Sequence, residues 1–163
     1  MQQFKEALKI LEKSQEFKEW KKNNPQDHLS YGMFIVEDKE REWKIGYCNK
    51  ENQLTSFNIG KKITIEPDEE ALQKKKQKIL GLDKEKLKLD LAEAVAIAND
   101  TQKEEFATET PTKIVAIVQK LDIGQIWNIT FLTQSFNTLN FKIDSSNGNV
   151  IEKKISPLFQ MQK

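Results

Sequence analysis

The chain contains one stretch twice, as WKIGYCNKENQLTSFNIG at residues 43–60 and as WNITFLTQSFNTLNFKID at residues 127–144. A shift of 84 positions places Trp43 on Trp127, and the apolar positions that follow coincide without a gap. In both copies apolar side chains alternate with others on either side of a polar turn, which is the pattern of a β-hairpin with one covered face. The stretch therefore predicts a duplicated hairpin and a protein made of two copies of one unit.

A helix is predicted before each hairpin, because apolar residues recur there at helical spacing. Asn23-Asn24-Pro25 ends the first of these helices, since proline cannot continue it. Asp90 followed by Glu93 resembles a capping box at the start of the second. Pro67-Asp68 predicts a further helix between the two copies. The predicted helices span residues 4–22, 69–80 and 91–106, and the predicted strands span residues 28–37, 42–48, 53–59, 63–65, 112–121, 125–133, 137–144 and 148–155.

The predicted fold class is α+β, with two pseudo-symmetric repeats that each have one helix and a four-stranded antiparallel sheet. Alternating strands need one covered face, and the apolar stripe of the helix can cover it. The first repeat is expected at residues 1–66, a connecting helix or linker at residues 67–88, and the second repeat with a C-terminal tail at residues 89–163. Sheet edges are expected at residues 28–37 and 112–121, or else at the closing strands 63–66 and 148–155.

Composition sets limits on the partners of this 163-residue chain. Lys and Arg number 26 and Asp and Glu 25, so a net charge of +1 provides no field to attract nucleic acid or an anionic membrane. The lysines at residues 74–78 could bind nucleic acid weakly, although the acidic residues around them favour a solvated segment. The sequence shows no signal peptide and no apolar run of about 18 residues. We expect a cytoplasmic protein without a membrane span, or an exported one if a leader has been removed.

Candidate catalytic residues are few. His28 and Cys48 are the only histidine and cysteine, so no disulfide within the chain and no cysteine metal site can form. Cys48 corresponds to Leu132 in the second copy, which indicates a packing position. We predict no enzymatic activity, no catalytic or metal-binding residue and no cofactor. The candidate binding residues are the aromatic side chains Trp43, Tyr47, Trp127 and Phe131. For Trp43 and Trp127 the favoured interpretation is a place in the sheet core, and an aromatic platform in a ligand cleft is the alternative.

Several segments of the second copy resemble a PepSY-type unit. They are LDLAEAVAIA at residues 89–98, WNITF at 127–131, FKID at 141–144 and GNVI at 148–151. The first copy is less similar, with Gly60 where the second has Asp144. The resemblance implies a cystatin-like fold and a relation to non-catalytic modules that bind or restrain peptidases.

These observations predict a module that binds a protein or peptide through a sheet face, a sheet edge or the groove between the halves. The alternative is a small-molecule-binding protein or enzyme with an apolar pocket between helix and sheet. Such a pocket would be lined by residues such as Phe34, Tyr47, Phe131 and Phe141. The identity of the partner, the oligomeric state and the placement of the halves stay open.

Overall fold

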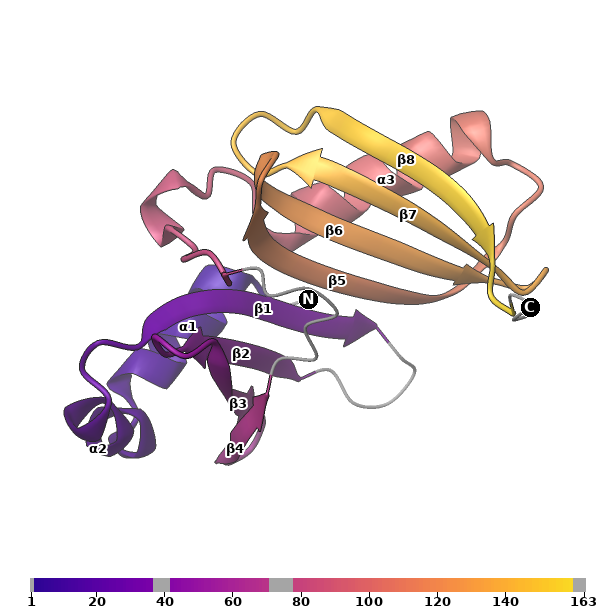
Figure 1. Ribbon diagram of the computed structural model, residues 1–163. Coiled ribbons are helices and arrows are strands. Elements are labelled where there is room, and N and C mark those ends of the chain that lie inside the picture. Colours follow the sequence, from indigo (N-terminus) through magenta and orange to yellow (C-terminus); the bar gives the residue numbers. More distant parts are fainter. Residues whose placement is uncertain (1, 37–41, 71–77, 160–163) are drawn as a thin grey trace.

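The computed structural model describes residues 2–36, 42–70 and 78–159, except for the side chains of residues 67–70. These residues form three α-helices, one 3-10 helix and eight strands (Figure 1). The helices are α1 (Phe4–Lys13), α2 (Gln15–Asn23) and α3 (Leu91–Glu105), and the 3-10 helix η1 covers Lys84–Lys86. The strands are β1 (His28–Val36), β2 (Trp43–Cys48), β3 (Gln53–Ile59), β4 (Ile63–Glu70), β5 (Pro111–Leu121), β6 (Gly124–Thr133), β7 (Asn137–Asp144) and β8 (Val150–Pro157).

All eight strands belong to one antiparallel sheet, in the order β4-β3-β2-β1-β5-β6-β7-β8. The prediction of two helix-plus-four-stranded repeats is therefore wrong, although the coarser α+β class holds. Strand β1 pairs with β5 over residues 31–36 and 114–119, so two of the strands expected at sheet edges lie at the centre. The edge strands are β4 and β8. They correspond to the closing strands, which the sequence offered as the second possibility for the sheet edges.

The two halves form a single sheet because pairing satisfies the backbone hydrogen-bonding groups of the two central strands, β1 and β5. An unpaired strand leaves a row of backbone N–H and C=O groups without partners, and pairing β1 with β5 satisfies both rows. The same pairing joins the apolar faces of the two halves. The ring of Phe4 lies 5.3 Å from that of Trp43 and 6.5 Å from that of Trp127, between centroids. The buried side chains consequently form one core across both halves.

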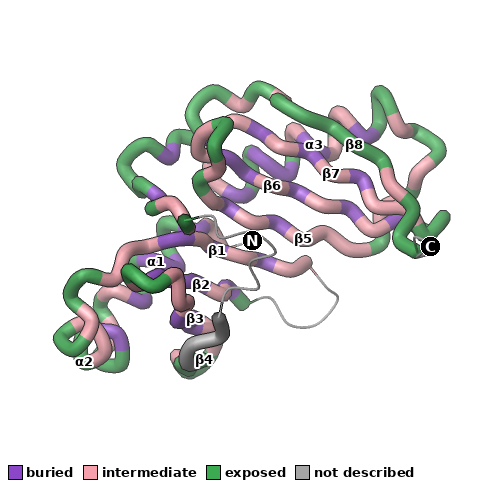
Figure 2. Tube along the Cα trace, in the orientation of Figure 1, coloured by how far each residue is buried: buried purple, intermediate pink, exposed green. Residues whose placement is uncertain are grey.

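The helices cover one face of the sheet. Helix α1 contacts β2 and β3, and α3 contacts β6 and β7; both lie behind the sheet in Figure 1. Figure 2 shows buried positions recurring along β5, β6 and β7, whereas β8 at the edge is mostly exposed. This alternation matches the period-2 pattern of the sequence.

The predicted helix at residues 4–22 is in fact two helices that meet at Ser14. Ser14 has extended backbone dihedrals, and its hydroxyl accepts a hydrogen bond from the Phe17 N–H at 3.2 Å while donating to the Leu11 carbonyl at 2.6 Å. Serine competes in this way with the helical backbone and favours a cap over a helix interior. The break reorients α2 and allows Phe17 to pack on the sheet.

The predicted connecting helix at residues 69–80 is not helical where the structure describes it. Strand β4 continues to Glu70, paired with β3, and residues 78–80 have no regular structure. Residues 71–77, which include Lys74 to Lys76 of the lysine run, lie outside the described residues.

Asp90 caps two helices at once. Its Oδ1 accepts hydrogen bonds from the N–H groups of Phe4 and Leu91, both at 2.7 Å, and its Oδ2 accepts one from Lys5 at 3.2 Å. The side chain of Gln3 accepts a hydrogen bond from the Ala92 N–H at 3.2 Å in return. The first N–H groups of a helix need such acceptors. The N-termini of α1 and α3 therefore meet at one carboxylate, which links the two halves.

Candidate functional site

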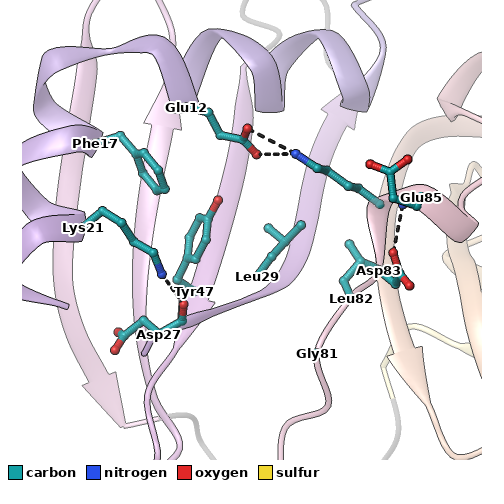
Figure 3. A pocket seen from close by; sticks show the side chains of 11 residues that line it. Glu12, Phe17, Lys21, Asp27, Leu29, Tyr47, Gly81, Leu82, Asp83 and Glu85 are labelled. Atoms are coloured by element: carbon teal, nitrogen blue, oxygen red, sulfur yellow. Dashed lines mark hydrogen bonds and ion pairs between the residues drawn. The ribbon is translucent and has the colours of Figure 1, made fainter. Parts of the chain in front are cut away.

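A pocket of about 650 Å³ opens where α1 and α2 meet the segment that leads to α3 (Figure 3). We call the described part of this segment, residues 78–90, the connection. The apolar lining of the pocket consists of Phe17 from α2, Leu29 from β1, Tyr47 from β2 and Leu82 from the connection. Charged side chains surround this lining: Glu12, Lys21, Asp27, Asp83, Lys84 and Glu85. A volume in this range and an apolar lining with a few polar groups are typical of ligand sites. We call it the Tyr47 pocket.

Aromatic packing holds the Tyr47 ring in place. The ring centroid lies 5.2 Å from that of Phe17, 5.4 Å from that of Trp20 and 5.9 Å from that of Phe57. The Lys21 ammonium lies 5.9 Å from the same centroid and donates a hydrogen bond to the Asp27 carbonyl at 2.5 Å. Tilted and edge-on ring pairs of this kind are favourable. Tyr47 thus offers a fixed surface to the pocket.

The hydroxyl of Tyr47 points into the pocket, toward the side on which Glu12 lies (Figure 3). Only 5% of the residue is exposed, yet the hydroxyl makes no hydrogen bond with any residue that the structure describes. Burial, and secondarily the Glu12 carboxylate, raise the pKa of Tyr47 well above its usual value. The phenol therefore stays neutral and can both donate and accept. The hydroxyl oxygen is accessible from the pocket, since every fully buried side-chain nitrogen or oxygen among the described residues has a partner, and a ligand in the pocket can form a hydrogen bond with it.

The far wall of the pocket is the connection around Leu82 to Glu85, which hydrogen bonds hold to both halves of the protein. The Leu82 N–H donates to the Leu29 carbonyl at 2.8 Å. The side chain of Gln125 on β6 accepts from the Asp83 N–H at 2.8 Å and donates to the Asp83 carbonyl at 2.9 Å. These bonds place Leu82 opposite Tyr47 and keep the wall in position.

A second hollow of about 540 Å³ adjoins the Tyr47 pocket along α1. Its lining includes Lys5, Leu8, Lys9 and Ile10 among others. The two hollows share Glu12, Lys84 and Glu85. The Lys84 ammonium lies 3.1 and 3.2 Å from the two carboxylate oxygens of Glu12. This partly exposed ion pair marks the boundary between them, and the two hollows together form a groove between α1 and the connection.

The four predicted binding residues occupy different environments. Trp43, Trp127 and Phe131 have no exposed surface, so they lie in the core, which is the place that the sequence favoured for the two tryptophans. The indole N–H groups of the two tryptophans also have partners: Trp43 donates to the Gln2 carbonyl at 3.0 Å, and Trp127 donates to the Leu89 carbonyl at 2.9 Å. Tyr47 alone of the four lines the pocket.

The other candidate residues lie outside the Tyr47 pocket. Phe34, Phe131 and Phe141, expected around an apolar pocket, are fully buried in the core and do not line the Tyr47 pocket. His28 Nε2 lies 3.3 Å from the Ile79 carbonyl, so the ring contacts the connection near its described start. No group of three potential ligands among the described histidine, cysteine and acidic residues could hold a metal ion.

Cys48 is predicted to react slowly with thiol reagents in the native protein. It is fully buried, and burial, aided by the Asp27 carboxylate, raises the pKa of its thiol, so little thiolate forms at neutral pH. We expect labelling by Ellman's reagent to be much slower than that of free cysteine and to become fast in denaturant. Labelling at the rate of free cysteine in native buffer would show that the thiol is accessible.

Most residues that line the Tyr47 pocket were not predicted from the sequence to be binding residues. Phe17 was assigned to the stripe of one long helix, and Leu82 and Glu85 to a linker. The serine at position 14, in the middle of a helical pattern, was the available signal for the break that places Phe17 over Tyr47. No local pattern indicates that the connection packs against β1, because the hydrogen bond between Leu82 and Leu29 joins residues far apart in the sequence.

Comparisons with known proteins give information on the fold of this chain and on nothing further. No family model matches the chain, and no curated protein matches it. Among solved structures, the fold is similar to that of a chain from Clostridium difficile 630 described as a “putative lipoprotein”, with a TM-score of 0.60, 13% identity, and coverage of 94% of this chain and 93% of that chain. At this identity the likeness shows the fold alone. Within the described part of the chain, no helix is long and apolar enough to cross a membrane.

Proposed function

We propose that this protein is a non-catalytic module that binds a polypeptide in the groove between α1 and the connection, with one side chain of the partner in the Tyr47 pocket. The observation that carries the proposal is the unpaired hydroxyl of Tyr47 at the end of an apolar pocket that continues into a second hollow. The PepSY-like resemblance of residues 89–155 agrees with such a role, since it implies modules that bind peptidases.

The shape of the site favours a polypeptide over a compact metabolite. A metabolite is usually enclosed by a single cavity, whereas here two hollows adjoin at the ion pair of Glu12 with Lys84. An extended chain can place successive groups in both. The rim of α1 offers Lys5, Lys9 and Glu12 to the polar groups of such a chain. Docking of an extended peptide in an aromatic-lined groove is one of the recurring modes of peptide recognition.

The test is a selection of short random peptides displayed on phage against the immobilised protein, followed by fluorescence anisotropy with the selected peptides. We expect Tyr47→Phe to weaken their binding about three- to tenfold, the value of one hydrogen bond. The free energy of unfolding should hardly change, because the hydroxyl has no partner among the described residues.

Tyr31→Phe is the matched control. It also removes one tyrosine hydroxyl, but this hydroxyl is 2.8 Å from the Ser56 hydroxyl and Tyr31 does not line the pocket. We expect it to lower the free energy of unfolding by about 1 kcal/mol and to leave peptide binding unchanged. The proposal is wrong if no peptide is selected, or if both variants affect binding equally. Recovery of a small molecule alone in the Tyr47 pocket would favour the alternative class.

A further inference from the structure

The charges around the Tyr47 pocket are unbalanced, although those of the whole chain are not. The lining has four carboxylates and two ammonium groups, a net charge of −2, in a protein whose net charge is +1. Both ammonium groups are already engaged, because Lys84 pairs with Glu12 and Lys21 donates to the Asp27 carbonyl. The carboxylates of Asp83 and Glu85 form no ion pair with either ammonium group, so their charge is available to a ligand.

Two of the four carboxylates, those of Asp83 and Glu85, lie on the wall formed by the connection. Asp83 uses Oδ1 to accept the Glu85 N–H at 3.0 Å, as the N-cap of η1. The Glu85 carboxylate has no partner among the residues that the structure describes. Both residues are exposed and line the pocket beside Leu82. A cation placed at this wall would thus be attracted by two carboxylates.

The opposite side of the pocket is aromatic. The rings of Phe17 and Tyr47 are 5.2 Å apart between centroids, and both residues are less than one-tenth exposed. Figure 3 shows Phe17 and Lys21 on one side of Tyr47, and Leu82 and Asp83 on the other. A flat aromatic side chain fits such a surface through tilted or edge-on ring contacts. An indole N–H would in addition give the Tyr47 hydroxyl the partner that it lacks.

We propose that the pocket recognises an aromatic anchor, with tryptophan preferred, next to a lysine or arginine in the polypeptide partner. The anchor contacts Phe17 and Tyr47, and the neighbouring cation lies against Asp83 and Glu85. This inference rests on the proposed function, because it specifies the peptide that the groove takes.

The test uses the peptides selected by phage display. We expect tryptophan followed or preceded by a basic residue to be enriched among them. In anisotropy measurements at low salt, replacing that basic residue by glutamate should weaken binding about fivefold to tenfold. About 1 M salt should remove most of this difference, since the screening length falls to about 3 Å there.

A double variant of the protein, Asp83→Asn with Glu85→Gln, isolates the two carboxylates. Asparagine can still cap η1, so the fold is expected to persist. The basic and glutamate-substituted peptides should bind this variant within about a factor of two of each other. The matched control is Asp100→Asn with Glu104→Gln, which removes two exposed charges of α3 and should keep the full preference.

The outcomes separate this inference from the proposed function. If peptides bind in a Tyr47-dependent way but show no basic preference, or if both double variants change it equally, the groove binds peptides and the charge inference is wrong. If no peptide binds at all, the proposed function and this inference fail together. A preference lost only in the Asp83 and Glu85 variant supports the inference.

Discussion

Trp127→Ala is expected to lower the free energy of unfolding by about 3–5 kcal/mol, the usual cost of truncating a buried tryptophan. The indole has no exposed surface, and its ring lies 6.5 Å from that of Phe4 and 6.3 Å from that of Trp43. Alanine would leave a cavity where the two halves share their core. It would also remove the hydrogen bond that the indole N–H donates to the Leu89 carbonyl at 2.9 Å.

Urea unfolding followed by far-UV circular dichroism measures this loss. Ile123→Ala is the control, because Ile123 is 51% exposed in the turn between β5 and β6; its effect should stay within about 0.5 kcal/mol. A loss below about 1 kcal/mol for Trp127→Ala would contradict a core position for the indole.

Asp90→Ala is expected to lower the free energy of unfolding by about 2–4 kcal/mol. A single N-cap substitution costs about 0.5–2 kcal/mol, and Asp90 serves Phe4 and Lys5 of α1 as well as Leu91 of α3. Its charge also lies where the positive ends of two helix dipoles meet. Losing it should loosen both helices at the junction of the halves.

Asp90→Asn should have a smaller effect, because the amide keeps one oxygen for the N–H groups of Phe4 and Leu91. Asp100→Ala is the control on the same helix: Asp100 is exposed, so its removal should change the free energy of unfolding by less than about 0.5 kcal/mol. Amide hydrogen exchange provides a second measurement, since Asp90→Ala should increase exchange in the first turns of both α1 and α3. Faster exchange in α3 alone would show that Asp90 does not hold α1.

Local patterns in the sequence predicted the strands well. The strand at residues 137–144 was predicted with its observed ends, and the capping role of Asp90 for α3 was also predicted. Both depend on neighbours in the sequence, namely the alternation of side chains and an acceptor next to free N–H groups. The buried position of Cys48 was inferred from its repeat counterpart, Leu132, although Leu132 itself is only partly buried.

Only the tertiary structure decided how the halves join and where a ligand can lie. The repeat predicted two similar units but carried no sign that β1 and β5 would pair, because backbone hydrogen bonds between distant strands do not depend on a local residue pattern. The capping of α1 by Asp90 was not predicted for the same reason, because the hydrogen bond from the Phe4 N–H to the Asp90 side chain joins residues 86 positions apart. The Tyr47 pocket combines residues from α1, α2, β1, β2 and the connection. The sequence by itself predicted most of the helices and strands, although not the break at Ser14 or the extension of β4 to Glu70. Such a pocket exists only once those segments are packed together.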